Sequence, residues 1–291
     1  RRSSDLNAIP MALNQVSVDE FVNSVKAMAP SFAGIHLEDI AAPRVFEIER
    51  RLSEELNIPV YHDDQTGTAI VVLAGLINAA KVVHKKLSEL KVIINGVGAA
   101  GVATAKILIA AGMTKITLID VHGVVSQNDD RYNSYQRELA RKVSQAAGET
   151  LDDVITGQDV FIGLSDAHVL SGEQVAKMGA RPIIFALANP VPEILPEEAL
   201  AAGAKVVATG SSQWPNQVNN VLVFPGLFKG LLASGLKHVD MALQVQIAKA
   251  LANMMTDPDE THIVPGVFGK GVVSQVEAAV LTYAKQHKEG S

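Results

Sequence analysis

Short apolar runs alternate with segments of helical spacing along most of the chain, and this alternation predicts an α/β fold. The central runs have the length and composition of strands that are buried on both faces of a parallel sheet. They cover residues 92–95, 116–119, 159–163, 182–187 and 204–208. We therefore expect a doubly wound, Rossmann-type parallel sheet with right-handed crossovers, and ligands at the carboxyl ends of its strands.

The segments on either side of this sheet have a different pattern. Two more apolar runs precede it, at 32–37 and 58–61, among helix candidates at 17–29, 43–56 and 66–87. After Thr209 the chain is polar and rich in turn residues, and two helical segments follow at 240–255 and 272–286. We interpret residues 1–80 and 215–291 as one discontinuous α/β domain whose return segment is helical, packed beside a central domain of residues 81–214.

The composition excludes several classes of protein. The chain has 291 residues, is 48% hydrophobic and carries a net charge of −6 with scattered Lys and Arg, so no basic stripe points to nucleic acid. It has no cysteine, which excludes disulfides and thiolate chemistry and suits a reducing compartment, so we expect a cytoplasmic location. The apolar stretch 69–80 is interrupted by Asn78 and is expected to be a buried helix rather than a membrane span. We expect a small-molecule substrate as the partner.

A glycine-rich turn follows the first central run. Gly96, Gly98 and Gly101 form the pattern GxGxxG, with Ala99 and Ala100 between the last two. In a dinucleotide site the first glycine permits the tight turn, the second lets the backbone approach a pyrophosphate, and the third lets the helix pack closely. Free N–H groups at the start of the helix then bind the phosphates. A glycine-rich turn can also be purely structural, but the order of strand, glycines, helix, strand and acid favours a dinucleotide.

That acid is Asp120, which ends the second central run about 20 residues after the glycines. A carboxylate at this place accepts hydrogen bonds from the adenosine ribose and repels the 2′-phosphate of NADP. The sequence therefore favours NAD, with NADP as the alternative because Lys115 and His122 lie nearby and soften the repulsion.

Two strand ends of the first domain carry adjacent acids, Glu38-Asp39 and Asp63-Asp64. Carboxylates that converge without a cation repel each other, and oxygen ligands suit Mg²⁺ or Mn²⁺. The alternative is that the aspartates cap the helices that follow them. Since both pairs end strands within one short segment, we favour a metal site. His62, beside the second pair, is expected to have a supporting or structural role.

Asparagines occur at similar places: Asn189 follows the fourth central run, and Asn219 and Asn220 precede the segment VLVFPG. Their amides have the chemistry to bind a substrate carboxylate or hydroxyl, or the nicotinamide ribose. The alternative for Asn189 is a turn residue before a proline.

Several stretches together resemble malic enzymes of the bacterial type. They are GIHLEDIAAPRVFEIE, PVYHDDQTGTAIVVLAGL, INGVGAAG, FALANPVPE and QVNNVLVFPG, which cover nearly the whole chain. Members of this family oxidise malate and decarboxylate it to pyruvate, with reduction of NAD or NADP. The resemblance implies a homodimer or homotetramer in which the discontinuous domain binds metal and substrate.

The resemblance also implies roles for individual residues. Glu38, Asp39 and Asp64 would bind Mg²⁺ or Mn²⁺, and Asp63 would act beside Asp64 in catalysis. The other implied residues bind malate or the cofactor: Gly96, Gly98, Ala99, Ala100, Gly101, Asp120, Asn189, Asn219 and Asn220.

Two features depart from the family pattern. The family's general acid tyrosine and general base lysine lie upstream of the matching part, so we expect a preceding segment to supply them. In addition, residues 164–168 read LSDAH where the family has a small, glycine-containing segment beside the cofactor.

Three alternatives follow. A relative that decarboxylates oxaloacetate or converts malate to lactate would use the same metal and cofactor. A chain without the acid and base would be a catalytically impaired nucleotide-binding fragment. A 2-hydroxyacid dehydrogenase without metal would leave the four acids unexplained.

Overall fold

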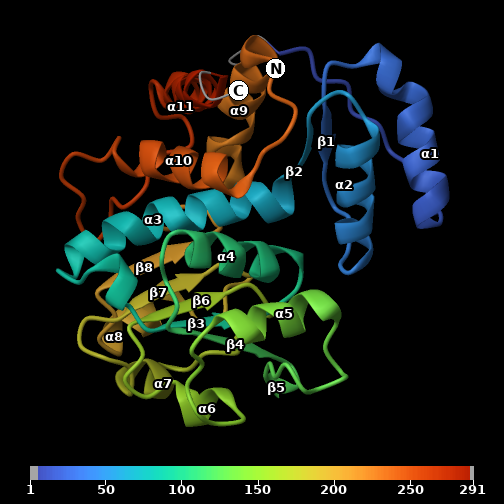
Figure 1. Cartoon of the computed structure of the whole chain (residues 1–291). Helices are drawn as coiled ribbons and strands as arrows, with labels where there is room; N and C mark the ends of the chain where they lie inside the picture. Colours follow the sequence, from blue (N-terminus) through green and yellow to red (C-terminus); the bar gives the residue numbers. More distant parts are fainter. Residues whose placement is uncertain (1–5, 289–291) are drawn as a thin grey trace.

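A six-stranded sheet forms the centre of the molecule, in the strand order β5-β4-β3-β6-β7-β8 (Figure 1). The computed structural model describes residues 6–288. All neighbouring strands are parallel except β5, which pairs antiparallel with β4. The strands are β3 (Val92–Asn95), β4 (Ile116–Asp120), β5 (Gly123–Val124), β6 (Val160–Gly163), β7 (Ile183–Ala186) and β8 (Val206–Thr209).

Helices cover both faces of this sheet, which explains why its strands are apolar throughout. Successive residues of β3 point to opposite faces: Ile94 packs into the core with helices α3 and α4, while Ile93 packs into the core on the other face. The helices above and below the sheet in Figure 1 are α3 (Thr68–Val82), α4 (Ala99–Ala110), α6 (Leu151–Val154), α7 (Gly172–Ala176) and α8 (Pro196–Ala201). Helix α5 (Ser134–Lys142) packs beside α4.

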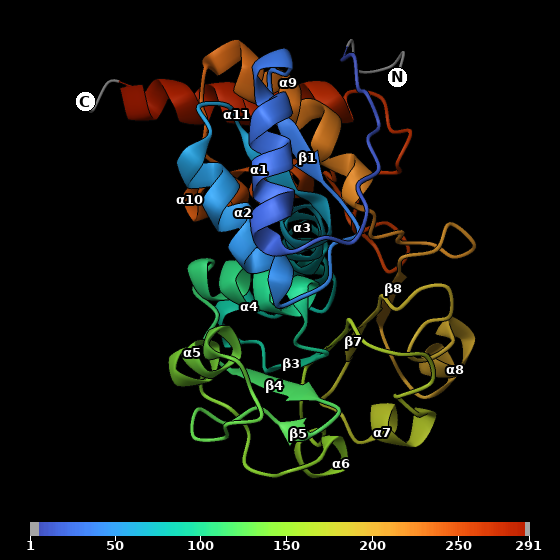
Figure 2. The ribbon, with the colours of Figure 1, turned by 90° about the vertical axis from the view of Figure 1, so that its right-hand side faces the viewer.

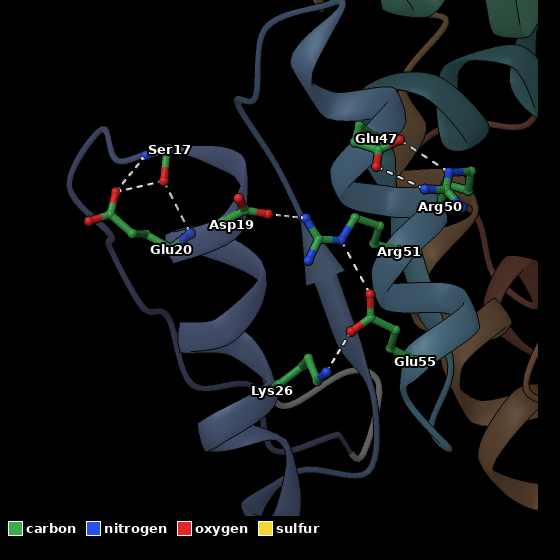
Figure 3. Close-up of polar contacts among 8 residues, drawn as sticks. All are labelled: Ser17, Asp19, Glu20, Lys26, Glu47, Arg50, Arg51 and Glu55. Atoms are coloured by element: carbon green, nitrogen blue, oxygen red, sulfur yellow. Dashed lines mark hydrogen bonds and ion pairs between the residues drawn. The ribbon is translucent and has the colours of Figure 1, made fainter.

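A separate two-stranded parallel sheet precedes the central sheet in the chain. Its strands are β1 (Ile35–Leu37) and β2 (Val60–His62), and it packs with α1 (Val18–Met28) and α2 (Arg44–Glu55). Arg51 on α2 pairs with Asp19 on α1 and with Glu55 on its own helix, and Lys26 pairs with the same Glu55 (Figure 3). These exposed pairs orient α1 along α2, while the apolar residues between the helices supply most of the stabilisation.

Three helices complete the chain: α9 (Phe224–Ser234), α10 (Met241–Ala252) and α11 (Val272–Lys288). Helix α11 packs against α9, and α10 packs against α3. Figure 2 views α3 along its axis, with α4 below it and the C-terminal helices above. The stretch Asp63–Val82 is long and apolar enough to cross a membrane, but 72% of its most apolar window is buried inside the protein. It is the core helix that the sequence predicts.

The predicted α/β class and doubly wound parallel sheet are confirmed. Several elements differ from the sequence-based expectation. The first strand is confined to Ile35–Leu37, after a 3₁₀ turn at residues 29–31. Strand β5 and helices α5 and α9 were not predicted from the sequence pattern. The division into a central and a discontinuous domain stays a prediction.

Candidate functional site

The two acidic pairs lie side by side because β1 and β2 are parallel neighbours. Leu37 is paired with His62 in the register of this sheet. Each acidic pair begins one residue later, so Glu38 and Asp63 emerge from the same edge. The chain then continues from β2 into a π-helical turn, Asp63–Gly67, which leads into α3.

A potential metal-binding cluster forms at this edge. Ligand atoms of His36, Glu38 and Asp63 all lie within 4.8 Å of one another. His36 Nε2 lies 3.0 Å from Glu38 Oε1 and 3.9 Å from Asp63 Oδ2. Two carboxylates and one imidazole are a donor set that a divalent cation such as Mn²⁺ accepts.

Only one of the three predicted metal ligands, Glu38, belongs to this cluster. The other two, Asp39 and Asp64, are linked to each other, because the Asp39 N–H donates to Asp64 Oδ2 over 2.9 Å. His36 was not identified from the sequence. The signal was present, because His36 lies two positions before Glu38 on a strand and so shares its face.

Asp63 is held by a buried tyrosine. The Tyr61 hydroxyl, on a side chain that is 1% exposed, donates to Asp63 Oδ1 over 2.8 Å. Burial raises the pKa of Asp63, and this hydrogen bond opposes the rise. Burial also raises the pKa of Tyr61 well above its ordinary value, so the hydroxyl keeps its proton. Asp63 therefore has one oxygen fixed by Tyr61 and the other near His36.

His62 is neutral in this site. Burial lowers its pKa to about 4, and its Nδ1 accepts a hydrogen bond from the Gln65 N–H. The proton of the neutral ring is therefore on Nε2, which is buried without a hydrogen-bond partner among residues 6–288 and lies 3.8 Å from Asp64 Oδ2. This arrangement fits the supporting role expected from the sequence.

The π-helical turn brings the acids close to two other parts of the chain. It packs against α4, which carries the glycine-rich turn, and against the 3₁₀ turn Asn220–Leu222. A Cβ at Gly67 would lie 2.6 Å from Asp63 Oδ1 and 2.9 Å from the Asn220 Cβ. Glycine is needed here because Asp63 and Asn220 approach the backbone so closely.

The three glycines of the GxGxxG pattern have the separate geometries that a dinucleotide site requires. Gly96 has a φ of 98° and turns the chain out of β3. A Cβ at Gly101 would lie 2.0 Å from the Gly96 carbonyl oxygen, whereas a Cβ at Gly98 would have no atom within 4 Å from the rest of the described chain, its own neighbours in sequence aside. Gly98 thus leaves open space at the start of α4, where Ala99 and Ala100 present N–H groups.

Asp120 ends β4 and its carboxylate is oriented by two donors. Its Oδ1 accepts hydrogen bonds from the His122 N–H at 2.8 Å and from the Tyr132 hydroxyl at 3.1 Å. Tyr132 is 3% exposed, and burial raises its pKa to about 12. The sequence pattern did not identify Tyr132, because no motif marks it and its contact with Asp120 forms only in the fold.

The remaining predicted residues occupy different settings. Asn189 is exposed after β7, and its amide lies against Gly210 at the end of β8. Asn219 accepts a hydrogen bond from the Val221 N–H and so caps the turn in which Asn220 lies. The segment 164–168 does lie by the glycine-rich turn, because a Cβ at Gly96 would be 2.4 Å from the Leu164 carbonyl oxygen.

Comparison with known families gives matches along most of the chain. Residues 65–285 match the family model described as "Malic enzyme, NAD binding domain", and residues 11–53 match "Malic enzyme, N-terminal domain". The "NAD-dependent malic enzyme" of Geobacillus stearothermophilus is 48% identical over 96% of this chain, and the "Bifunctional malic/malolactic enzyme" of Bacillus subtilis is 45% identical over 97%. This chain spans 59% of the length of the first relative and 70% of the second.

Solved structures give the same result. The crystal structure of malic enzyme from Pyrococcus horikoshii OT3 superposes with a TM-score of 0.93 at 40% identity, over 98% of this chain and 68% of that one. An NAD-dependent malic enzyme from Thermotoga maritima superposes with a TM-score of 0.91 at 43% identity, over 96% of this chain and 74% of that one.

Proposed function

The chain belongs to the malic enzyme family, and from this premise we propose that it serves the oxidative decarboxylation of malate to pyruvate and CO₂. NAD is the proposed oxidant and Mg²⁺ or Mn²⁺ the proposed metal. Because the chain spans only part of the length of its relatives, this activity is assigned to the whole polypeptide that contains it.

The proximity of the acids to the glycine-rich helix carries this proposal. One π-helical turn begins with Asp63 and Asp64 and packs against α4, which carries the glycine-rich turn. Hydride transfer requires the substrate carbon and the nicotinamide to meet, so a metal site and a dinucleotide site must be neighbours. A doubly wound domain that binds nucleotide alone has no need of the acids at the ends of β1 and β2.

The residues present fit a divalent cation. Glu38 is largely exposed, Asp64 is partly exposed, and neither bonds a lysine or arginine among residues 6–288. We propose that Glu38, Asp39 and Asp64 hold the cation, with His36 next to them. When bound, the cation would supply Lewis-acid stabilisation of negative charge on the C2 oxygen of malate.

The surrounding side chains orient the substrate. Asp63 is fixed by Tyr61 and acts beside Asp64. Asn220 and Asp63 both approach Gly67, and Asn189 follows β7. We propose that the two asparagines donate amide hydrogen bonds to malate or to the nicotinamide ribose. Asp120 favours NAD over NADP.

A second candidate reaction is the conversion of malate to lactate, since one relative is named as both malic and malolactic. Both reactions use the same ligands, but only the first releases NADH. Incubation of the whole polypeptide with malate, NAD and Mn²⁺ separates them: NADH with pyruvate supports the proposal, and lactate without NADH supports the alternative. Binding of NADH without turnover of malate would indicate an impaired nucleotide-binding protein.

Assembly and location remain predictions. The proposed homodimer or homotetramer derives from the family resemblance, and light scattering of the purified protein tests it. The proposed cytoplasmic location derives from the absence of cysteine.

A further inference from the structure

Glu193 lies between two loops at the carboxyl end of the central sheet. Its Oε1 accepts a hydrogen bond from the Ser165 N–H at 3.1 Å, and its Oε2 accepts one from the Ala188 N–H at 3.0 Å. Ser165 belongs to the loop after β6, and Ala188 to the loop after the neighbouring strand β7. One carboxylate therefore holds the ends of two adjacent strands.

This carboxylate is buried without a cation. Glu193 is 0% exposed, and no lysine, arginine or histidine forms an ion pair with it among residues 6–288. Burial raises its pKa, and the two backbone N–H groups oppose that rise. A Cβ at Gly163 would lie 2.2 Å from the Glu193 Cδ, so the last residue of β6 must be glycine to admit the carboxyl group. A buried anion is costly, and an apolar side chain would fill the same space without that cost.

The loop held by Glu193 is in contact with the glycine-rich turn. The Leu164 N–H donates to the Asn95 carbonyl at the end of β3, and the Leu164 carbonyl packs on Gly96. The Ser165 hydroxyl is buried and has no hydrogen-bond partner in the described part of the chain. A buried hydroxyl without a partner is rare in a folded protein, and this one lies in the loop beside the glycine-rich turn.

The strand order identifies which half of a dinucleotide would lie there. In the sheet, β4 and β5 lie on one side of β3, and β6, β7 and β8 lie on its other side. The strand order therefore reverses between the neighbouring strands β3 and β6, and dinucleotides bind across such a switch point. Asp120 at the end of β4 marks the adenosine side. The ends of β6 and β7, with Asn189 directly after Ala188, are therefore on the nicotinamide side.

We propose that Glu193 is a positioning residue for the nicotinamide half of the cofactor, acting through the backbone of Ser165 and Ala188. The inference rests on the proposed function in one respect, that the ligand is a pyridine dinucleotide. Glutamine at this position would keep the shape of the side chain, but its NH₂ group would face one of the two N–H donors. Substitution should therefore displace one loop while the hydrophobic core stays intact.

The test compares a whole cofactor with a truncated one. Calorimetry gives the Kd of NADH and of ADP-ribose, which lacks the nicotinamide, for the unmodified chain, Glu193→Gln and Glu198→Gln. Glu198 is a matched control, because it also accepts a backbone N–H, from Gly172, but lies on the exposed surface of α8. We expect Glu193→Gln to weaken NADH binding about ten-fold and to leave ADP-ribose binding unchanged. The control, Glu198→Gln, should change neither the affinity for NADH nor that for ADP-ribose.

If Glu193→Gln weakens the binding of NADH and of ADP-ribose equally, or weakens neither, the inference is overturned while the proposed function stands. Failure of the unmodified chain to bind NADH overturns the proposed use of NAD, and the inference with it. If Glu193→Gln does not fold, hydrogen exchange in the unmodified chain tests the inference instead. NADH, but not ADP-ribose, should then protect residues 164–166 and 187–189, and equal protection by both ligands contradicts the inference.

Discussion

The backbone N–H of Asp39 donates a hydrogen bond to Asp64 Oδ2 over 2.9 Å, which joins the acids that follow two neighbouring strands. Asp39 has a φ of 56°, a conformation that asparagine and aspartate tolerate better than most residues. The chain thus turns sharply after β1 and directs its N–H at the acid that follows β2. This bond orients Asp64 before any cation binds.

Removal of the Asp64 charge should weaken metal binding. We expect Asp64→Asn to lower Mn²⁺ affinity by about 100-fold, since a ligand and the acceptor for Asp39 are altered together. Calorimetric titration with Mn²⁺ measures the effect. Asp130→Asn, an exposed acid paired with Arg137, is the control and should bind Mn²⁺ as the unmodified chain does. Equal Mn²⁺ affinity in both variants would exclude Asp64 as a ligand.

Two of the glycines should respond differently to alanine. Gly98→Ala places a methyl group in open space, so the thermal unfolding temperature should stay unchanged while NADH affinity falls about ten-fold or more. Gly101→Ala forces a methyl group against the Gly96 carbonyl, so it should lower both the thermal unfolding temperature and the affinity for NADH. Calorimetric NADH titration and thermal unfolding by circular dichroism separate the two effects. Unchanged NADH affinity in Gly98→Ala would place the pyrophosphate elsewhere.

The Asp120 carboxylate should set the preference for NAD. We expect Asp120→Asn to weaken NADH binding about ten-fold. The difference in affinity between NADH and NADPH should become smaller, because the repulsion of the 2′-phosphate is removed. Tyr132→Phe keeps the ring and removes one of the two donors to Asp120, so its effect should be smaller and in the same direction. A larger preference for NADH in either variant would contradict this role.

Glu49 should make the stability depend on pH. Burial raises its pKa from 4.5 to about 7, and the charge of Lys106 and the hydrogen bond from Gln65 only partly oppose this rise. The folded state therefore binds more protons than the unfolded state between these values, and the free energy of unfolding falls as pH rises through them. Since the side chain is partly exposed, we expect a loss of about 2 kcal/mol.

Urea unfolding at pH 5 and pH 8 measures this dependence. Glu49→Gln should lose less stability between the two pH values than the unmodified chain does. The exposed Glu54→Gln should retain the full dependence. An identical pH dependence in the Glu49 variant would show that other groups cause it.

The sequence predicts the sheet well because its strands are buried on both faces and read as continuous apolar runs. Helix α9 was not predicted because Gly226 and Gly230 weaken its helical pattern. These glycines are explained only by the fold, since a Cβ at either would lie within 2.6 Å of a valine on α11. This contact between α9 and α11 cannot be predicted from the local sequence.

The candidate site shows the same division. The acids at the ends of β1 and β2 could be found from the chain alone, because a strand followed by acids is a local pattern. The partners that orient them could not: Tyr61 is an apolar-run residue in the sequence, and its hydroxyl acquires a role only when Asp63 folds back to it. In the sequence, Glu193 is likewise only an acid in a loop. Its contacts with Ser165 and Ala188 form only when β6 and β7 pair in the fold.

The most direct test of the proposed function is the product balance of the whole polypeptide that contains this chain, incubated with malate, NAD and Mn²⁺. Absorbance measures NADH, and pyruvate and lactate are measured separately. We predict NADH and pyruvate in equal amounts, and neither product from the Asp64→Asn variant. Lactate without NADH, or no turnover of malate by a protein that binds both NADH and Mn²⁺, would contradict the proposed reaction.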